Sequence, residues 1–230
     1  TAHSEARAEE IGRQLAASVN DWWKQQLAQQ FQLDSALELE YETHYCRFLM
    51  PTIRGAEQGS KKRYAGRVNH HGRDQIVFKG LETVRTDWTR LAKEFQQTLY
   101  SLIFRREPWQ QYVRDTVAQL MAGELDDKLI YSKRLRRPLD EYQRNVPPHA
   151  RAARLFDDYA RKAGHPLRYQ KGGTIRYVMT TRGPEPLNAR SAPLDYDHYL
   201  TRQLEPVADG ILGFVGGDFN TLITGQLGLF

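Results

Sequence analysis

Hydrophobic residues recur at every fourth position near the start of the chain. Ile11, Leu15, Val19, Trp23 and Leu27 fall on one face of a helix with about 3.6 residues per turn. Acidic side chains are frequent in the first turns of this segment, where the helix dipole favours negative charge. The pattern predicts an amphipathic helix over residues 4–30.

The chain then changes to a period of two. From Leu37 to Tyr45, apolar residues and a threonine alternate with three glutamates and a histidine, which predicts a strand with one buried face. Residues 62–68 and 75–79 predict a hairpin across a polar turn that contains Gly72. One helix and three strands make a small α+β unit.

Long helices predominate after Gly80. A stripe of large apolar residues from Trp88 to Leu102 predicts a helix that begins at Thr86 or Asp87. Because this pattern differs from the one before it, we predict a division of the chain near Gly80.

Proline and glycine delimit the following elements. Residues 108–123 and 147–164 each begin with proline and end with glycine, as helices often do. Residues 174–180 alternate like a strand, and residues 196–212 predict a helix bent at Pro206, which lacks a backbone N–H. The expected fold class is α+β: a small antiparallel sheet with one packed helix, followed by a mainly helical region.

Charge and cysteine content narrow the function. The 230 residues include 33 Lys and Arg against 28 Asp and Glu, and the cations are bunched at Lys61–Arg63 and Lys133–Arg137. Such clusters are either solvated faces or sites for an anionic partner. Cys46 is the only cysteine, so neither a disulfide nor a cysteine zinc cluster can form. The sequence has no apolar run near the roughly 20 residues of a membrane helix, and we expect a cytoplasmic protein.

The first basic cluster stands at the entrance of a predicted strand. Alternation sends Lys62 and Tyr64 to one face and Lys61 and Arg63 to the other. Lysine and arginine bind phosphates without reading sequence, so this segment predicts contacts with duplex DNA of any sequence.

Three segments carry a resemblance to a known family. Lys61–Gly66 resembles the Lys-Lys-x-Tyr motif of family-B DNA polymerases, and Gly80–Trp88 resembles the segment that leads from palm to thumb in that family. Val146–Ala153 resembles the thumb helix that approaches the primer duplex. The segments occur in the family's order, and the resemblance covers essentially the whole chain.

This resemblance implies an organisation and a function. Residues 1–80 would be the carboxy-terminal part of the palm, residues 81–215 the thumb and residues 216–230 a flexible tail. The partner would be duplex primer–template DNA in the bacterial nucleoid, and the intact enzyme would serve DNA replication or repair. By similarity, the DNA-binding residues would be Lys61, Lys62, Arg63, Tyr64, Lys133, Arg134, Arg136, Arg137, His149 and Arg151.

The last residues suggest a second partner. Gln226, Leu227, Leu229 and Phe230 resemble the clamp-binding peptide of bacterial DNA polymerases, and they follow the glycine-rich stretch 216–218. Two apolar anchors on a mobile tether would fill a pocket on the sliding clamp. In the alternative interpretation, they pack onto their own domain.

The resemblance also indicates what to expect of catalysis. The family's metal-binding aspartates include an Asp-Thr-Asp motif, which does not occur here, so we expect no catalytic residue or bound metal in this chain and Mg²⁺ only in the intact polymerase. Glu42 is either an accessory palm carboxylate or, with Glu38 and Glu40, part of the solvent-exposed face of a strand. Arg85 and Asp87 form either a buried pair that orients the thumb or a helix-cap ion pair.

Two other functions stay open. The chain can be a free-standing, non-catalytic adaptor that links duplex DNA to a clamp. It can also be a small metal-dependent nuclease that uses Glu38, Glu40 and Glu42, since carboxylate oxygens bind hard cations.

Overall fold

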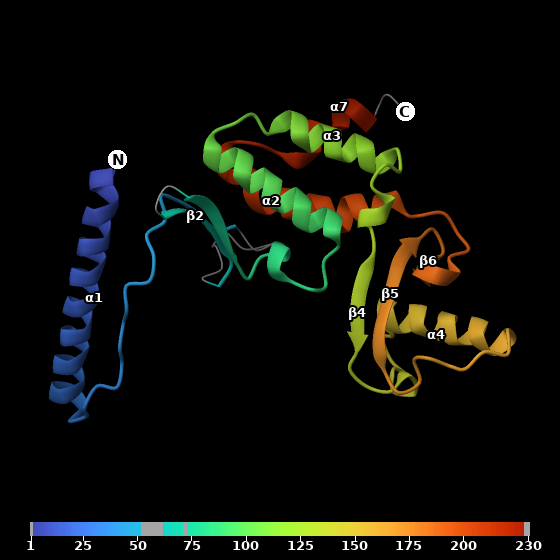
Figure 1. Ribbon diagram of the computed structural model, residues 1–230, viewed down its shortest axis with the longest axis horizontal. Coiled ribbons are helices and arrows are strands. Elements are labelled where there is room, and N and C mark those ends of the chain that lie inside the picture. The colour runs from blue at the N-terminus through green and yellow to red at the C-terminus, as the bar shows by residue number, and fades with distance from the viewer. Residues whose placement is uncertain (1, 52–61, 71–72, 228–230) are drawn as a thin grey trace. The chain divides into compact units, whose positions relative to one another are not determined.

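The computed structural model describes residues 2–51, 62–70 and 73–227 (Figure 1). It contains several helices and two three-stranded antiparallel sheets, so the α+β class is confirmed. The described residues fall into two compact units: one within Thr1–Phe48 and Gly66–Val77, the other within Leu49–Ala65 and Phe78–Phe230. The division into palm and thumb stays a prediction.

Helix α1 (Ala2–Phe31) of the first unit confirms the first expected element. Many of its apolar side chains lie in solvent, including Leu15 at 60% and Trp22 at 51% exposure. The helix packs closely at Gly12, where an added Cβ would lie 2.2 Å from Cδ2 of Tyr41.

The strand predicted over residues 37–45 is wrong. This segment has no regular secondary structure, and Leu37 and Leu39 are more than half exposed. The Asn20 side chain occupies both backbone groups of Leu39: Nδ2 donates to the carbonyl over 2.9 Å, and Oδ1 accepts from the amide over 2.8 Å. An alternating pattern makes a strand only where a neighbouring strand takes these groups.

The predicted hairpin is confirmed with slightly different bounds. Strands β1 (Arg47–Leu49), β2 (Tyr64–His70) and β3 (Arg73–Lys79) form a sheet in that order. An ion pair between Arg67 and Asp74 links β2 to β3, with Nε 2.6 Å from Oδ1.

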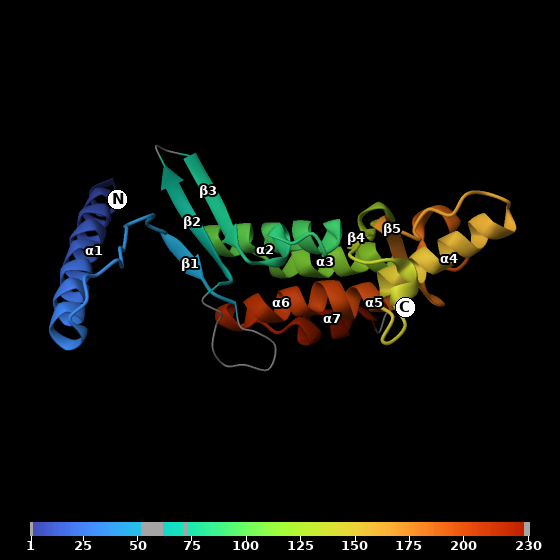
Figure 2. The ribbon, with the colours of Figure 1, turned by 90° about the horizontal axis from the view of Figure 1, so that it is seen from below.

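The second unit contains a helical bundle. Helices α2 (Arg90–Arg105) and α3 (Gln110–Met121) lie over α6 (Glu205–Leu212) and α7 (Phe219–Leu227), as Figure 2 shows. Helix α5 (Tyr196–Tyr199) leads into α6 through a π-helical stretch at Leu200–Leu204, which ends two residues before Pro206, where a bend was predicted. The largest fully buried side chains of the bundle are Phe95, Leu99, Tyr100, Leu120, Tyr199, Leu204, Ile211, Leu212 and Phe219.

Helix α2 begins later than predicted. Its cap is Thr89, whose hydroxyl oxygen accepts from the amide of Ala92 over 3.3 Å; neither Thr86 nor Asp87 is the cap. A contact distant in sequence fixes this start, because Oε1 of Gln203 accepts from both the amide and the hydroxyl of Thr89, over 3.1 and 2.8 Å.

A second sheet completes this unit. Strands β4 (Tyr131–Leu135), β5 (Gly173–Thr180) and β6 (Gly183–Pro186) pair antiparallel, and α4 (Pro148–Lys162) packs against them. Helix α4 and strand β5 match the sequence prediction, whereas β4 and β6 were not predicted.

The glycine-rich stretch after α6 forms a tight corner instead of the expected loose tether. A Cβ on Gly217 would lie 2.3 Å from Cη2 of Trp109, so only glycine lets these groups pack without a shift. Asp218 then begins α7, since its Oδ1 accepts from the amide of Thr221 over 2.7 Å. Phe219 and Ile223 are buried at 1% and 5% exposure.

We expect Phe219→Ala to lower the free energy of unfolding by about 3–5 kcal/mol, because it leaves a cavity at a buried position. Urea unfolding of the chain measures this change. The matched control is Phe214→Ala, at a side chain that is 54% exposed, where the change should stay within about 0.5 kcal/mol. Equal losses for the two variants would contradict the packed α7.

Candidate nucleic-acid interface

The first candidate region is the motif segment, which we define as Lys62, Arg63 and Tyr64 of the second unit. Lys62 is exposed and Tyr64 is partly buried; Lys61 lies outside the described residues. Gly80 packs closely on this segment: it has a φ of +63°, and an added Cβ would lie 2.2 Å from the carbonyl oxygen of Lys62. Glycine at this position therefore lets the end of β3 return beside the motif.

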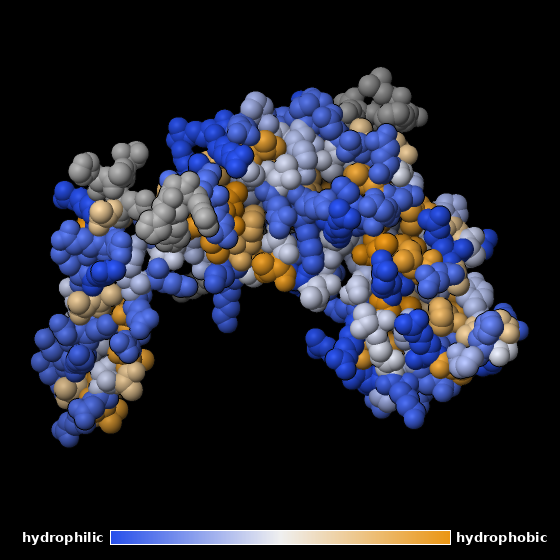
Figure 3. All heavy atoms as spheres, in the orientation of Figure 1, coloured by the Kyte–Doolittle hydropathy of each residue, from blue (hydrophilic) through white to orange (hydrophobic). Residues whose placement is uncertain are grey.

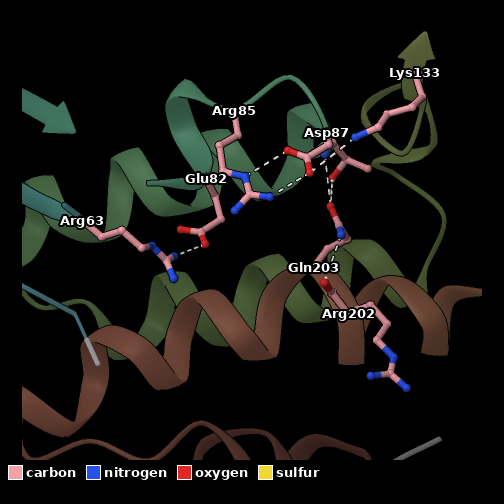
Figure 4. A network of polar contacts seen from close by, with 8 residues as sticks. Arg63, Glu82, Arg85, Asp87, Lys133, Arg202 and Gln203 are labelled. Carbon is pink, nitrogen blue, oxygen red and sulfur yellow. Dashed lines mark hydrogen bonds and ion pairs between the residues drawn. The ribbon is translucent and has the colours of Figure 1, made fainter. Parts of the chain in front are cut away.

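Arg63 points into the protein. Its guanidinium forms an ion pair with Glu82, whose side chain is only 7% exposed (Figure 4). Glu82 also accepts from Nε2 of Gln96 in α2 over 2.7 Å, and Oε1 of Gln96 accepts from the amide of Thr83 over 3.0 Å. The sequence grouped Arg63 with the DNA-binding residues, whereas its guanidinium here binds a buried carboxylate.

Asp87 contacts two cations in this region. Arg85 donates to it through two nitrogens, over 3.0 and 2.8 Å, and Nζ of Lys133 in β4 lies 3.6 Å from Oδ2. The hydrogen bond from Arg85 is the main cause that lowers the pKa of Asp87 to about 2. Because Thr89 caps α2, the helix-cap alternative is wrong. The expected burial of the pair is wrong too, since the side chains of Arg85 and Asp87 are 47% and 31% exposed. The pair connects the segment before α2 to β4.

The second candidate region is a depression of about 340 Å³ beside β4, which we call the basic pocket. Leu135 of β4 is buried, whereas Arg134, Arg136 and Arg137 are exposed. The region of β4 and α4 shows many hydrophilic residues at its surface (Figure 3). The residues that line the basic pocket are Lys133, Arg134, Arg136, Arg137, Tyr142 and His149.

Five of the six residues predicted for the thumb therefore surround one pocket. The sixth, Arg151, is exposed on α4 and does not line it; its Nη2 lies 3.2 Å from the position of a Cβ on Gly183. His149 is half-buried, and burial, together with the charge of Lys133, lowers its pKa below the usual 6.5. The imidazole is neutral at pH 7.

Tyr142 is the lining residue that the sequence analysis missed. It follows a 3-10 turn at Leu139–Glu141 and is 6% exposed. The guanidinium carbon of Arg137 lies 4.4 Å from the centre of its ring, and its hydroxyl accepts from the amide of Arg136 over 3.1 Å. An isolated tyrosine in a polar stretch has no periodicity that would have pointed to this position.

The carboxylates do not make a metal site in the part of the chain that is described. No group of three or more His, Cys, Asp or Glu side chains there is placed to hold a metal ion. Glu38, Glu40 and Glu42 are all exposed on a segment without strand geometry, so the alternation that would align them is missing. These residues do not fit a magnesium centre.

The end of the chain is described in part. Gln226 and Leu227 close α7, whereas Leu229 and Phe230 lie outside the described residues. Within the described residues, no helix has the length and apolar content needed to cross a membrane.

Comparison with known proteins fits these features. Residues 2–213 match the family model described as DNA polymerase family B. DNA polymerase II of Escherichia coli is 66% identical over 229 residues, which covers 100% of this chain and 29% of that protein. DNA polymerase 2 of Aeropyrum pernix is 33% identical over 169 residues, covering 68% of this chain and 20% of that protein.

A DNA polymerase of Pyrococcus horikoshii is 30% identical over 214 residues, covering 86% of this chain and 16% of that protein. The chain thus spans less than a third of the length of these relatives. The match to the family model over nearly the whole chain confirms the family that the three sequence segments indicated, and the chain belongs to DNA polymerase family B.

Proposed function

We propose that this chain is the carboxy-terminal palm and thumb part of a DNA-directed DNA polymerase, in which it binds primer–template duplex DNA without sequence specificity. The observation that carries this proposal is the 66% identity, over the whole chain, to a protein named DNA polymerase II. We expect such an enzyme in the bacterial cytoplasm, associated with the nucleoid.

The basic pocket supplies chemistry for this role. Arg134, Arg136 and Arg137 are exposed beside one depression, and planar guanidinium groups pair well with phosphate oxygens. Contacts of this kind hold a duplex by its backbone and carry no sequence information. The affinity therefore depends on salt far more than on base sequence.

The residues in and next to the motif segment have two proposed roles, which are contact with DNA and attachment to the rest of the protein. We propose that Lys61, Lys62 and Tyr64 contact the primer–template, while Arg63 holds the segment against α2 through Glu82. A charged side chain on a segment that is already fixed loses less conformational entropy on binding than one on a mobile loop.

The chemical step belongs to the intact polymerase in this proposal. Template-directed nucleotidyl transfer needs two metal ions that activate the primer hydroxyl and stabilise the leaving pyrophosphate. Since the described carboxylates do not fit such a centre, we expect this chain alone to be inactive, with Glu42 at most an accessory group.

The tail provides a second contact in this proposal. Gln226, Leu227, Leu229 and Phe230 would dock on the bacterial sliding clamp and keep the polymerase near its substrate. The adaptor alternative shares both contacts and differs in having no catalytic partner region.

Removal of two pocket charges tests the duplex proposal. We expect Arg136→Ala with Arg137→Ala to weaken binding to two duplexes of unrelated sequence by the same factor. The slope of log affinity against log salt should fall in magnitude by about 1.8, because two phosphate contacts are lost. Fluorescence anisotropy at several salt concentrations measures both quantities.

The charge-matched control for this experiment is Arg161→Ala with Lys162→Ala, at exposed positions in the last turn of α4. Its salt slope should stay near that of the unchanged chain. A loss that appears with one DNA sequence alone, or equally in both double variants, contradicts the proposal.

His149 gives the pocket a defined pH dependence. Because the pKa of His149 is lowered, its imidazole is neutral at about pH 7.5 and gains a proton only below about pH 6.5. We expect His149→Gln to leave duplex affinity unchanged at about pH 7.5, and to bind more weakly than the unchanged chain only once the pH falls below the lowered pKa of His149. Equal affinities at the lower pH would show that His149 does not face the phosphates.

The tail is tested separately. We expect Leu229→Ala with Phe230→Ala to abolish co-elution with a bacterial sliding clamp, because both apolar anchors are lost, and to leave duplex affinity unchanged. Phe214→Ala, which removes an exposed apolar side chain outside the tail, serves as the control and should still co-elute. A doubly substituted tail that still binds the clamp would overturn this part of the proposal.

A further inference from the structure

One of the residues that line the basic pocket is a buried tyrosine, Tyr142. Tyr142 is buried at 6% exposure, although it stands in a stretch where Asp140, Glu141, Gln143 and Arg144 are all exposed. A buried tyrosine is expected to use both its ring and its hydroxyl. The contacts of Tyr142 show that both are used on residues of the pocket.

The ring of Tyr142 supports one arginine and one histidine. The guanidinium carbon of Arg137 lies over the ring face, 4.4 Å from its centre, which is within the range of a cation–π contact. The His149 ring meets the same ring edge to face, with the two centres 5.9 Å apart. One side chain thus positions two of the polar groups that line the pocket.

The hydroxyl acts on the backbone. It accepts a hydrogen bond from the amide of Arg136 over 3.1 Å, immediately after β4 ends at Leu135. This bond fixes the direction in which the chain leaves the strand, and with it the two consecutive arginines. The ring and the hydroxyl therefore act on the same turn.

The backbone around Tyr142 is itself held by hydrogen bonds to other parts of the second unit. Arg154 of α4 donates to the carbonyl oxygens of both Leu139 and Tyr142, and the amide of Leu139 donates to the carbonyl of Gln170 over 3.1 Å. The turn before Tyr142 is thus tied to the helix and to the loop before β5. The position of the ring is set by the protein interior and not by the exposed arginines.

From these contacts we infer that Tyr142 is a positioning residue, which arranges Arg136 and Arg137 in advance for the phosphate groups of a duplex. The inference rests on the proposed function of the basic pocket. An arginine that is already placed loses less rotamer freedom when it meets a phosphate, so binding is tighter than for the same charge on a free side chain.

Substitution of Tyr142 in the full 230-residue chain tests the inference. We expect Tyr142→Leu to weaken binding to short duplexes of two unrelated sequences by about 3- to 10-fold, because the ring no longer holds Arg137. Tyr142→Phe keeps the ring and loses only the hydroxyl, so its affinity should lie between those of the unchanged chain and Tyr142→Leu. If Tyr142→Leu binds as tightly as the unchanged chain, the inference is wrong.

The matched control is Tyr169→Leu. Tyr169 is 5% exposed, meets another aromatic ring edge to face and lies under the guanidinium of Arg168, but it does not line the basic pocket. Thermal unfolding should show similar destabilisation in both leucine variants, while only Tyr142→Leu weakens duplex binding. Equal weakening in both variants would reduce the role of Tyr142 to general stability and overturn the inference.

A double-mutant cycle separates this inference from the proposed function. If Tyr142 acts through Arg137, then Tyr142→Leu should weaken duplex binding much less in a chain that already carries Arg137→Ala. Fully additive losses would overturn the inference while the duplex proposal stands. If neither Arg136→Ala nor Arg137→Ala weakens binding, the duplex proposal for this pocket fails, and the inference fails with it.

Discussion

The ion pair between Arg63 and Glu82 is the constraint on which the arrangement of the second unit depends. Glu82 is buried, so its charge is tolerated only with partners, and it receives them from the motif segment and from Gln96 of α2. Removal of one partner from a buried pair typically costs about 3–5 kcal/mol, because the other charge is left uncompensated. The start of β2 and the first helix of the bundle are thereby held together.

The residues that follow Glu82 connect to the second sheet. Arg85 holds Asp87 through two hydrogen bonds, and Asp87 reaches Lys133 of β4, as Figure 4 shows. A short stretch between the hairpin and α2 therefore contacts both candidate DNA-binding regions. Its charges are neutralised in pairs, whereas Arg134, Arg136 and Arg137 are the exposed cations of the basic pocket.

The sequence was sufficient to predict those helices and strands whose residues contact near neighbours in the chain. Helix α4 and strand β5 were predicted because proline, glycine and hydrophobic spacing act within a few residues. The family resemblance came from the same kind of short segments, and it placed five residues of the basic pocket on one surface before their geometry was known. It gave no indication of Tyr142, whose role depends on neighbours that only the folded chain brings to it.

The sequence by itself determined the α+β class, most helices, the hairpin and the family, because periodicity and short motifs are local properties of the chain. Tertiary structure decided which groups were paired. The side chain of Asn20 took the backbone groups that a strand at Leu39 needed, Gln203 moved the start of α2 to Thr89, and Trp109 packed against Gly217 where a tether was expected. In each case a residue distant in sequence forms the hydrogen bond or fills the space that decides the local structure. The local sequence pattern contains no information about that residue.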